Sequence, residues 1–179
     1  MGYSYKKFYN KTAAFFKARP TAKKALPVFD IALTVLFGIA YLTLWIYGIF
    51  WSEFGAKDFL RIAFIPLLTL FVVSILRAMI SRPRPYAEDG AGITPLTKKA
   101  DEKNSFPSRH LACATAIAIS FFPVLPVAGI ALLLLCALLA YVRFALGLHY
   151  PSDLLAGAAV GSLIAGLYYL MEYVFALIS

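Results

Sequence analysis

Long uncharged apolar stretches constrain the fold of this 179-residue chain more than any other feature of its sequence. Residues 31–51, 62–76 and 111–142 contain no Asp, Glu, Lys or Arg. A helix needs roughly 20 apolar residues to cross the hydrocarbon core of a bilayer. Charged residues make up only 15% of the chain, whereas a typical soluble domain carries about 25%. We therefore expect an integral membrane protein.

The apolar stretches predict an all-α helical bundle with about five transmembrane helices. Pro123 and Pro126 divide the longest stretch into two short antiparallel helices, because proline ends a helix. The expected spans cover residues 31–51, 59–80, the two parts of 111–142, and a last span that opens with 154–171. No internal repeat or soluble domain interrupts them, so we expect residues 26–179 to form one membrane-embedded domain.

The first 25 residues have a different character, with seven Lys or Arg and no Asp or Glu. Aromatic residues recur between the lysines at helical spacing, which predicts an amphipathic interfacial helix that ends near Pro20. We take residues 1–25 as a basic interfacial segment. The net charge of +8 could suggest a nucleic-acid partner, but basic residues beside membrane spans contact anionic headgroups. We expect the bilayer as the partner, not nucleic acid, and the positive-inside rule places this segment in the cytoplasm.

The remaining polar residues gather at the ends of the spans. They occupy residues 77–85, 107–110, 143 and 149–153. In a bundle of five alternating spans these segments all lie on one face, and ionisable groups at membrane depth indicate a functional site. Guanidinium groups match the charge of a phosphate, and Pro107 suits the first position of a helix whose Ser108 and Arg109 N–H groups would hold an anion. The cluster predicts a phosphate site.

The two histidines of the chain supply a reaction for such a site. Asp153 lies four residues after His149, beside a helix start at Pro151, so it can fix the ring tautomer and favour the protonated form. The other ring nitrogen of His149 then faces the phosphate as a nucleophile. His110, one turn into the opposing helix, can protonate the leaving oxygen and afterwards activate water.

Each of these residues also has a structural alternative. The arginines could anchor a span to headgroups, Ser108 could cap a helix, and His110 could be an interfacial polar residue. His149 and Asp153 could form a buried structural pair. For the whole protein, the alternatives are an anionic-solute transporter or a catalytically inactive membrane scaffold. A transporter would distribute polar residues through its spans, whereas these spans are apolar.

Four small residues are expected to serve packing. Cys113 and Cys136 lie inside apolar runs and predict buried thiols, with no disulfide framework or metal site. Gly157 and Gly161 have the spacing that lets two helices approach closely. We expect that contact within one protomer, and the sequence leaves the oligomeric state open.

The spacing of the polar residues resembles the type-2 phosphatidic acid phosphatase superfamily. The pattern of that family is a Lys, six residues and Arg-Pro, then Pro-Ser-Gly-His, then Ser-Arg, five residues, His, three residues and Asp. The corresponding residues here are Arg77 with Arg84-Pro85, then Pro107-Ser108-Arg109-His110, then Val142-Arg143 with His149 and Asp153. The match covers residues 77–153. Arg77, Arg109 and Val142 replace the lysine, glycine and serine of the pattern.

The resemblance implies a metal-independent membrane lipid phosphatase that needs no cofactor and forms a phosphohistidine. It implies three catalytic residues: His149 as nucleophile, Asp153 as orienting acid and His110 as proton donor. The implied phosphate ligands are Arg77, Arg84, Ser108 and Arg143, with Arg109 as a further possible substrate contact. The implied substrates are phosphatidic acid, phosphatidylglycerophosphate and polyprenyl diphosphates such as undecaprenyl diphosphate, and nothing in the sequence ranks them. The implied location is a bacterial plasma membrane. Typical bacterial relatives act on its outer face, whereas the positive-inside rule predicts a cytoplasm-facing site.

Overall fold

All secondary structure in the described part of the chain is α-helical. The computed structural model describes residues 2–50, 56–87, 93–97 and 103–178. The helices are α1 Gly2–Lys17, α2 Pro20–Phe50, α3 Ala56–Ile80, α4 Arg109–Ser120, α5 Pro126–Ala145 and α6 Pro151–Ile178. Four segments are long and apolar enough to cross a membrane: α2, residues Arg61–Ile80 of α3, α5 and α6. The expected all-α membrane bundle is confirmed, and the chain is a multi-pass membrane protein.

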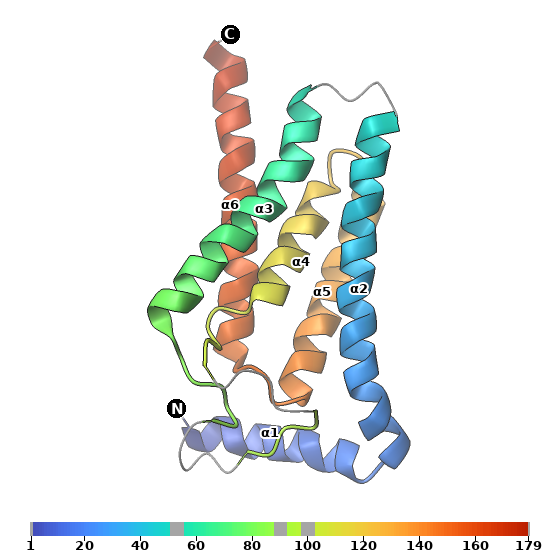
Figure 1. The fold of residues 1–179 in the computed structure, drawn as a ribbon, viewed down its shortest axis with the longest axis vertical. Helices are drawn as coiled ribbons and strands as arrows, with labels where there is room; N and C mark the ends of the chain where they lie inside the picture. The colour runs from blue at the N-terminus through green and yellow to red at the C-terminus, as the bar shows by residue number, and fades with distance from the viewer. Residues whose placement is uncertain (1, 51–55, 88–92, 98–102, 179) are drawn as a thin grey trace.

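The short helix α4 lies at the centre of the bundle (Figure 1). It packs against α2, α3, α5 and α6, and eight of its 12 residues are buried. A helix of 12 residues is too short to cross a bilayer core, so the predicted count of five full spans is only approximate. The tight turn that Pro123 and Pro126 predict does separate α4 from α5. The second helix is not short, however, because α5 has 20 residues.

Two glycines let α6 approach α4 closely. A Cβ atom on Gly157 would collide with the backbone carbonyl of Ser108, and one on Gly161 would collide with the carbonyl of Ala112. The small-residue spacing therefore serves packing inside one protomer, as predicted. The contact places the start of α4 directly beside the second and third turns of α6.

Helix α2 begins earlier than the apolar stretch at residues 31–51 predicts. It runs from Pro20 through Pro27 and Asp30 to Phe50, while Trp51 lies outside the described residues. Proline is tolerated at the first position of a helix, which accounts for the start at Pro20. The predicted start at residue 31 excluded Asp30, an acid that faces the protein and forms an ion pair with Arg143.

The N-terminal helix α1 lies across the end of the bundle (Figure 1). It ends at Lys17, close to the predicted end near Pro20. Its inner face is buried against protein: Tyr9 is 1% exposed and Ala13 2%. The Tyr9 hydroxyl donates a hydrogen bond to the carbonyl of Thr94 at 2.8 Å. The aromatic stripe thus holds the loop after α3, while Phe8 remains largely exposed although its ring lies 5.4 Å from that of Phe144.

Candidate active site

The predicted site segments meet at the end of the bundle that α1 covers. In Figure 1 the end of α3, the start of α4, the end of α5 and the start of α6 all reach this end. The expected convergence on one face follows from the alternating directions of these helices. The segment between α3 and α4 also contacts the residues before α6, because Arg84 donates to the carbonyl of Leu148 at 3.3 Å.

Asp153 is the most completely fixed side chain of the site. It is fully buried in the first turn of α6, and its Oδ2 accepts hydrogen bonds from the Tyr150 N–H at 2.9 Å and from the Ser105 hydroxyl. Its Oδ1 accepts a hydrogen bond from Nη1 of Arg82 at 2.8 Å. The bond to Tyr150 satisfies a backbone donor at the helix start, as in a capping box. Three donors from three parts of the chain therefore orient one carboxylate.

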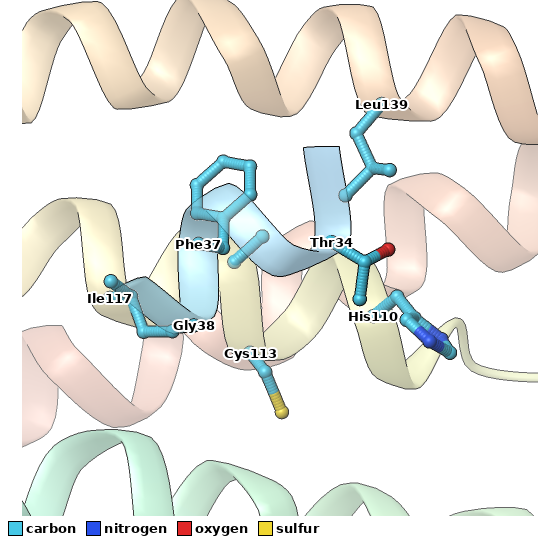
Figure 2. A pocket seen from close by; sticks show the side chains of 8 residues that line it. Thr34, Phe37, Gly38, His110, Cys113, Ile117 and Leu139 are labelled. Carbon is cyan, nitrogen blue, oxygen red and sulfur yellow. The ribbon is translucent and has the colours of Figure 1, made fainter. Parts of the chain in front are cut away.

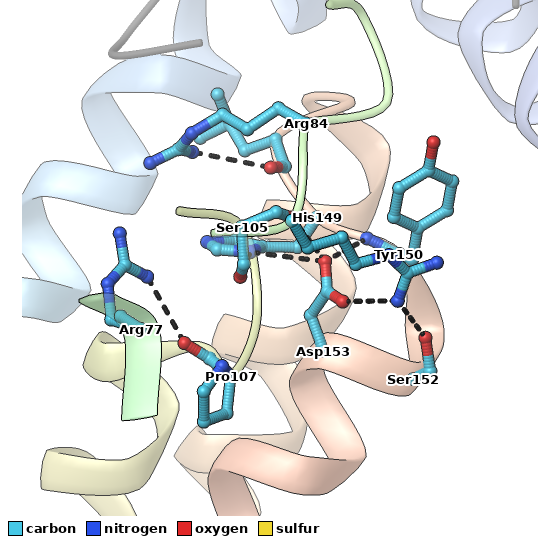
Figure 3. Close-up of polar contacts among 10 residues, drawn as sticks. Arg77, Arg84, Ser105, Pro107, His149, Tyr150, Ser152 and Asp153 are labelled. Atoms are coloured by element: carbon cyan, nitrogen blue, oxygen red, sulfur yellow. Dashed lines mark hydrogen bonds and ion pairs between the residues drawn. The ribbon is translucent and has the colours of Figure 1, made fainter. Parts of the chain in front are cut away.

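His149 is almost fully buried, and its ring is held mainly by backbone. Its Nδ1 lies 3.0 Å from the carbonyl oxygen of Ser105 and 3.6 Å from Oδ2 of Asp153. The longer contact exceeds hydrogen-bond distance, so the Nδ1–H donates to Ser105. Asp153 lies within ion-pair distance of the ring, and its Oδ2 also accepts from the hydroxyl of Ser105. Its role in fixing the tautomer stays a prediction. The remaining nitrogen, Nε2, points toward the space between Arg77 and Arg84 (Figure 3).

The electrostatic surroundings of His149 favour the neutral ring. Burial lowers its pKa below the usual range, and the charges of Arg84 and Arg143 act in the same direction. Asp153 opposes them but does not overcome the burial. Asp153 favours the imidazolium, as predicted, but desolvation disfavours the charged form more strongly. A neutral ring keeps the lone pair on Nε2 that a nucleophile needs.

Three arginines of the predicted phosphate site are anchored by different parts of the chain. Arg77 donates to the carbonyl of Pro107 at 3.1 Å, and Arg84 donates to the carbonyl of Leu148 at 3.3 Å. Arg143 forms an ion pair with Asp30 of α2, with Nε 3.0 Å from Oδ1 and Nη2 3.1 Å from Oδ2. These contacts fix the guanidinium groups before any ligand arrives, which is what preorganised anion binding requires.

Ser108 and Arg84 present buried donors without a partner among the described residues. The Ser108 hydroxyl and Nε of Arg84 are both inaccessible to solvent and make no hydrogen bond there. Ser108 occupies the N-cap position of α4, but its side chain makes no capping bond. Buried polar groups are nearly always hydrogen-bonded, so such donors call for an explanation. An anion in the site would accept from both.

The start of α4 differs in detail from the prediction. Pro107 is not its first residue, because the helix begins at Arg109 with Ser108 as N-cap. The Ser108 N–H is also engaged, since it donates to the carbonyl of Asp153 at 2.9 Å. The backbone N–H groups that can bind an anion are therefore those that follow Ser108. The carbonyl of Ser108 already accepts the first hydrogen bond of the helix.

The other two predicted residues on α4 have different positions. His110 is half-buried and within electrostatic range of Arg143, His149 and Arg77. Arg109 is exposed, so its side chain is not among the buried residues of the cluster. The structure thus brings His110 within electrostatic range of His149 and leaves Arg109 on the surface beside the cluster.

Sequence reasoning missed three residues of this cluster. Arg82 donates to both Asp153 and the hydroxyl of Ser152, Ser105 supports the His149 ring, and Asp30 holds Arg143. The sequence around two of them, Asp30 and Arg82, indicates a role. Asp30 is an acid beside a long apolar run, and such acids are rarely without a role. Arg82 stands within an Arg-Pro-Arg-Pro sequence, whereas Ser105 has no distinctive neighbourhood.

A sequence model of the PAP2 superfamily matches residues 58–175, which include every residue of the predicted site. The chain belongs to the PAP2 superfamily. The crystal structure of LpxE from Aquifex aeolicus is similar, with a TM-score of 0.66 at 24% identity over 81% of this chain and 86% of that one. The first transmembrane PAP2-type phosphatidylglycerolphosphate phosphatase from Bacillus subtilis has a TM-score of 0.57 at 20% identity over 96% of both chains. Comparison with curated proteins gave no match. These likenesses show that the chain has a PAP2 phosphatase fold.

Proposed function

We propose that this PAP2 protein hydrolyses a phosphate or diphosphate ester of a membrane lipid through a phosphohistidine at His149. The observation that carries the proposal is a pair of buried donors, the Ser108 hydroxyl and Nε of Arg84, that have no hydrogen-bond partner among the described residues. The backbone of Ser108 is bonded to Asp153, and Arg84 to Leu148 next to His149. Both donors suit phosphate oxygens. The two similar structures, described as LpxE and as a phosphatidylglycerolphosphate phosphatase, also support a lipid phosphate as the substrate.

The first step is attack by the imidazole on phosphorus. Nε2 of His149 forms the P–N bond while the bond from phosphorus to the lipid oxygen breaks, and His110 gives that oxygen its proton. Charge develops on the phosphoryl oxygens, which Arg77, Arg84 and Arg143 stabilise. The Nδ1–H bond to Ser105 lets the ring bear the positive charge that phosphorylation creates.

The second step returns the enzyme to its starting state. His110, now neutral, takes a proton from a water molecule that attacks the phosphohistidine from the side that the lipid alcohol vacated. The P–N bond breaks, inorganic phosphate leaves, and His110 is protonated again. One histidine therefore acts as acid and then as base, as microscopic reversibility requires.

The substrate must be an amphiphile whose phosphate reaches the end of the bundle while its chain stays in the bilayer. Phosphatidic acid, phosphatidylglycerophosphate and polyprenyl diphosphates all meet this condition. A diphosphate would place a second charged group beside the exposed Arg109. Turnover of a diphosphate lipid compared with a monophosphate lipid separates these classes.

The proposed orientation puts the site on the cytoplasmic side. The basic helix α1 and the site occupy the same end of the bundle (Figure 1), so they face the same compartment. Lysine-rich segments beside membrane spans stay in the cytoplasm. A cysteine at Gly2 should be protected from an impermeant thiol reagent on intact cells. Labelling there would instead place both α1 and the site outside.

The decisive experiment compares His149→Ala with the unmodified protein in detergent. Phosphate release from a panel of lipid phosphates should be abolished in the variant, while its elution profile and helical content stay unchanged. Unmodified protein quenched in alkaline SDS should carry a phosphate that is stable in base and labile in acid, as expected of phosphohistidine. Retained turnover in His149→Ala would rule out His149 as the nucleophile.

A further inference from the structure

The inner face of α1 packs on the segment that carries His149. The ring of Tyr5 lies 4.8 Å from the ring of Tyr150, the residue that follows His149. One turn later in α1, the hydroxyl of Tyr9 lies against Gly147, where an added Cβ would come within 2.8 Å of it. The φ of Gly147 is 76°, a conformation that glycine adopts without strain. Two aromatic side chains of α1 therefore hold this segment from outside.

The contact with Tyr150 leads to the buried acid of the site. The guanidinium of Arg82 lies on the Tyr150 ring, 4.1 Å from its centroid, and Nη1 of Arg82 is 2.8 Å from Oδ1 of Asp153. The backbone N–H of Tyr150 donates to Oδ2 of Asp153 at 2.9 Å. Tyr150 thus connects Tyr5 with the ion pair of Arg82 and Asp153, and a displacement of α1 removes the support of its ring.

A cavity of about 200 Å³ lies beside His110 (Figure 2). Its described lining comes from α2, α4 and α5, with Thr34, Cys113 and Leu139 among its residues. The described side chains of α1 contact the site elsewhere, at the segment before α6. A displacement of α1 should therefore change the rate of the chemical step more than the binding of substrate.

The outer face of α1 is basic and partly aromatic. Lys7 and Lys11 are exposed and four residues apart, so they repel each other along the helix, and the first 25 residues contain no acid that compensates for them. Phe8 and Phe15, seven residues apart and so on one side of the helix, are both more than half exposed. Lysines beside exposed aromatic rings are typical of a helix in the interface of a bilayer. Anionic headgroups would also relieve the repulsion between the lysines.

The inner contacts alone hold α1 weakly. A free helix of 16 residues is only marginally stable in water. Among the described side chains of α1, the buried ones are Tyr9, Ala13 and Phe16. The position of α1 therefore depends also on what its outer face binds.

We propose that α1 couples the bilayer surface to catalysis: its lysine-bearing face binds anionic headgroups, and its aromatic face then holds the His149 segment in place. An anionic bilayer surface therefore raises kcat, with Tyr5 as a positioning residue that acts through Tyr150. The catalytic readout of this coupling rests on the proposed function, whereas the docking of α1 is measurable without turnover.

The first test compares kcat in nanodiscs of phosphatidylcholine with kcat in nanodiscs of equal parts phosphatidylcholine and phosphatidylglycerol. Phosphatidylglycerol is a phosphodiester and offers no terminal phosphate for the proposed reaction. The substrate is p-nitrophenyl phosphate, which stays in water. An anionic surface repels it and raises KM, so kcat is the parameter compared. Since one lysine near an anionic surface contributes about fivefold in binding, kcat should rise by about threefold or more.

Two double variants show whether α1 carries this response. Lys7→Gln with Lys11→Gln should abolish the rise in kcat. Lys23→Gln with Lys24→Gln is the matched control, because it removes two exposed lysines at the start of α2 and leaves α1 intact, and it should keep the rise. An equal kcat of the unmodified protein in both bilayers, or an equal rise in the two double variants, would overturn the proposal.

Substitutions of Tyr5 test the inner face. Tyr5→Ala removes the ring that packs on Tyr150 and should lower kcat by about tenfold in both bilayers, with KM nearly unchanged. Tyr5→Phe keeps the ring and should behave like the unmodified protein, because the Tyr5 hydroxyl makes no hydrogen bond among the described residues. An unchanged kcat in Tyr5→Ala would refute the positioning role.

Hydrogen exchange measures the docking of α1 without turnover. In the bilayer with phosphatidylglycerol, the amides of residues 5–16 and 146–150 should exchange more slowly than in phosphatidylcholine alone. Lys7→Gln with Lys11→Gln should lose this protection, and Lys23→Gln with Lys24→Gln should keep it. Protection without turnover of any lipid phosphate would refute the proposed function and keep the coupling of the two segments. Equal exchange of both segments in the two bilayers would refute the coupling, whatever the activity.

Discussion

Nη1 of Arg82 lies 2.8 Å from Oδ1 of Asp153, and this ion pair joins two residues that are 71 positions apart. The carboxylate is fully buried, whereas the Arg82 side chain is 32% exposed. The guanidinium also lies over the ring of Tyr150, 4.1 Å from its centroid. Arg82 therefore seals the outer side of Asp153, which in turn binds Ser105, the residue whose carbonyl accepts the Nδ1–H of His149.

Arg82→Gln should lower kcat through this chain of contacts and leave KM nearly unchanged, because Arg82 does not reach the phosphate. A displaced nucleophile costs up to about 100-fold in rate. Arg82→Lys can keep one contact to Oδ1 and should recover part of the loss. Steady-state kinetics on a lipid phosphate measure both parameters. A rise in KM with unchanged kcat would show instead that Arg82 binds substrate.

Ser105→Ala separates the hydroxyl of this residue from its carbonyl. The variant removes the hydrogen bond to Oδ2 of Asp153 and keeps the backbone acceptor of the His149 ring. We expect a loss of about tenfold in kcat, the scale of one positioning hydrogen bond. His149→Ala, by comparison, should abolish turnover. A loss in Ser105→Ala as complete as that in His149→Ala would mean that the hydroxyl takes part in the chemistry.

The pH dependence should reflect the buried ring of His149. Burial lowers its pKa, and only the neutral ring can attack, so the acid limb of kcat/KM should lie below about pH 6.5, the ordinary histidine value. His110 must hold a proton in the same step, and burial lowers its pKa as well, so the basic limb should also lie at a lower pH than an ordinary histidine would give. The lowered pKa of His149 also destabilises the fold in acid, because the unfolded chain binds a proton below about pH 6.5 that the folded ring does not. An acid limb above 6.5 would contradict the lowered pKa.

The ion pair between Asp30 and Arg143 should stabilise the packing of α2 on α5. Their side chains are only 13% and 6% exposed, and removing one member of a buried pair costs about 3–5 kcal/mol. Asp30→Ala should therefore lower the unfolding temperature in detergent. The double variant Asp30→Ala with Arg143→Met should unfold at a higher temperature than Asp30→Ala alone, because no charge is then left unpaired. Additive losses would show that the pair is not coupled.

The sequence was sufficient for the all-α bundle and for the end at which its polar segments meet, but not for the start of α2 or the short length of α4. A sequence shows local composition directly, and local composition determines the uncharged runs, the turn at Pro123 and Pro126, and the direction of each span. The contacts of His149 do not depend on local composition, because its partner is a backbone carbonyl and every residue has one. Likewise, the role of Asp30 depends on the packing of α2 against α5, which residue spacing within one helix does not determine.

The last prediction concerns the close approach of α4 and α6. Gly157→Ala adds a methyl group where the carbonyl of Ser108 lies, so the first turn of α4 must move away from α6. Overpacking of this kind costs about 1–3 kcal/mol. It also moves Ser108 and His110 relative to His149, and a misplacement of this size costs about 100-fold in rate. Gly166→Ala, on the same helix with open surroundings, should keep full activity and gain roughly 0.5–1 kcal/mol from better helix propensity. Thermal unfolding and phosphate release measure the two effects separately. A folded Gly157→Ala variant with full turnover would mean that the spacing between α4 and α6 does not set the geometry of the two histidines.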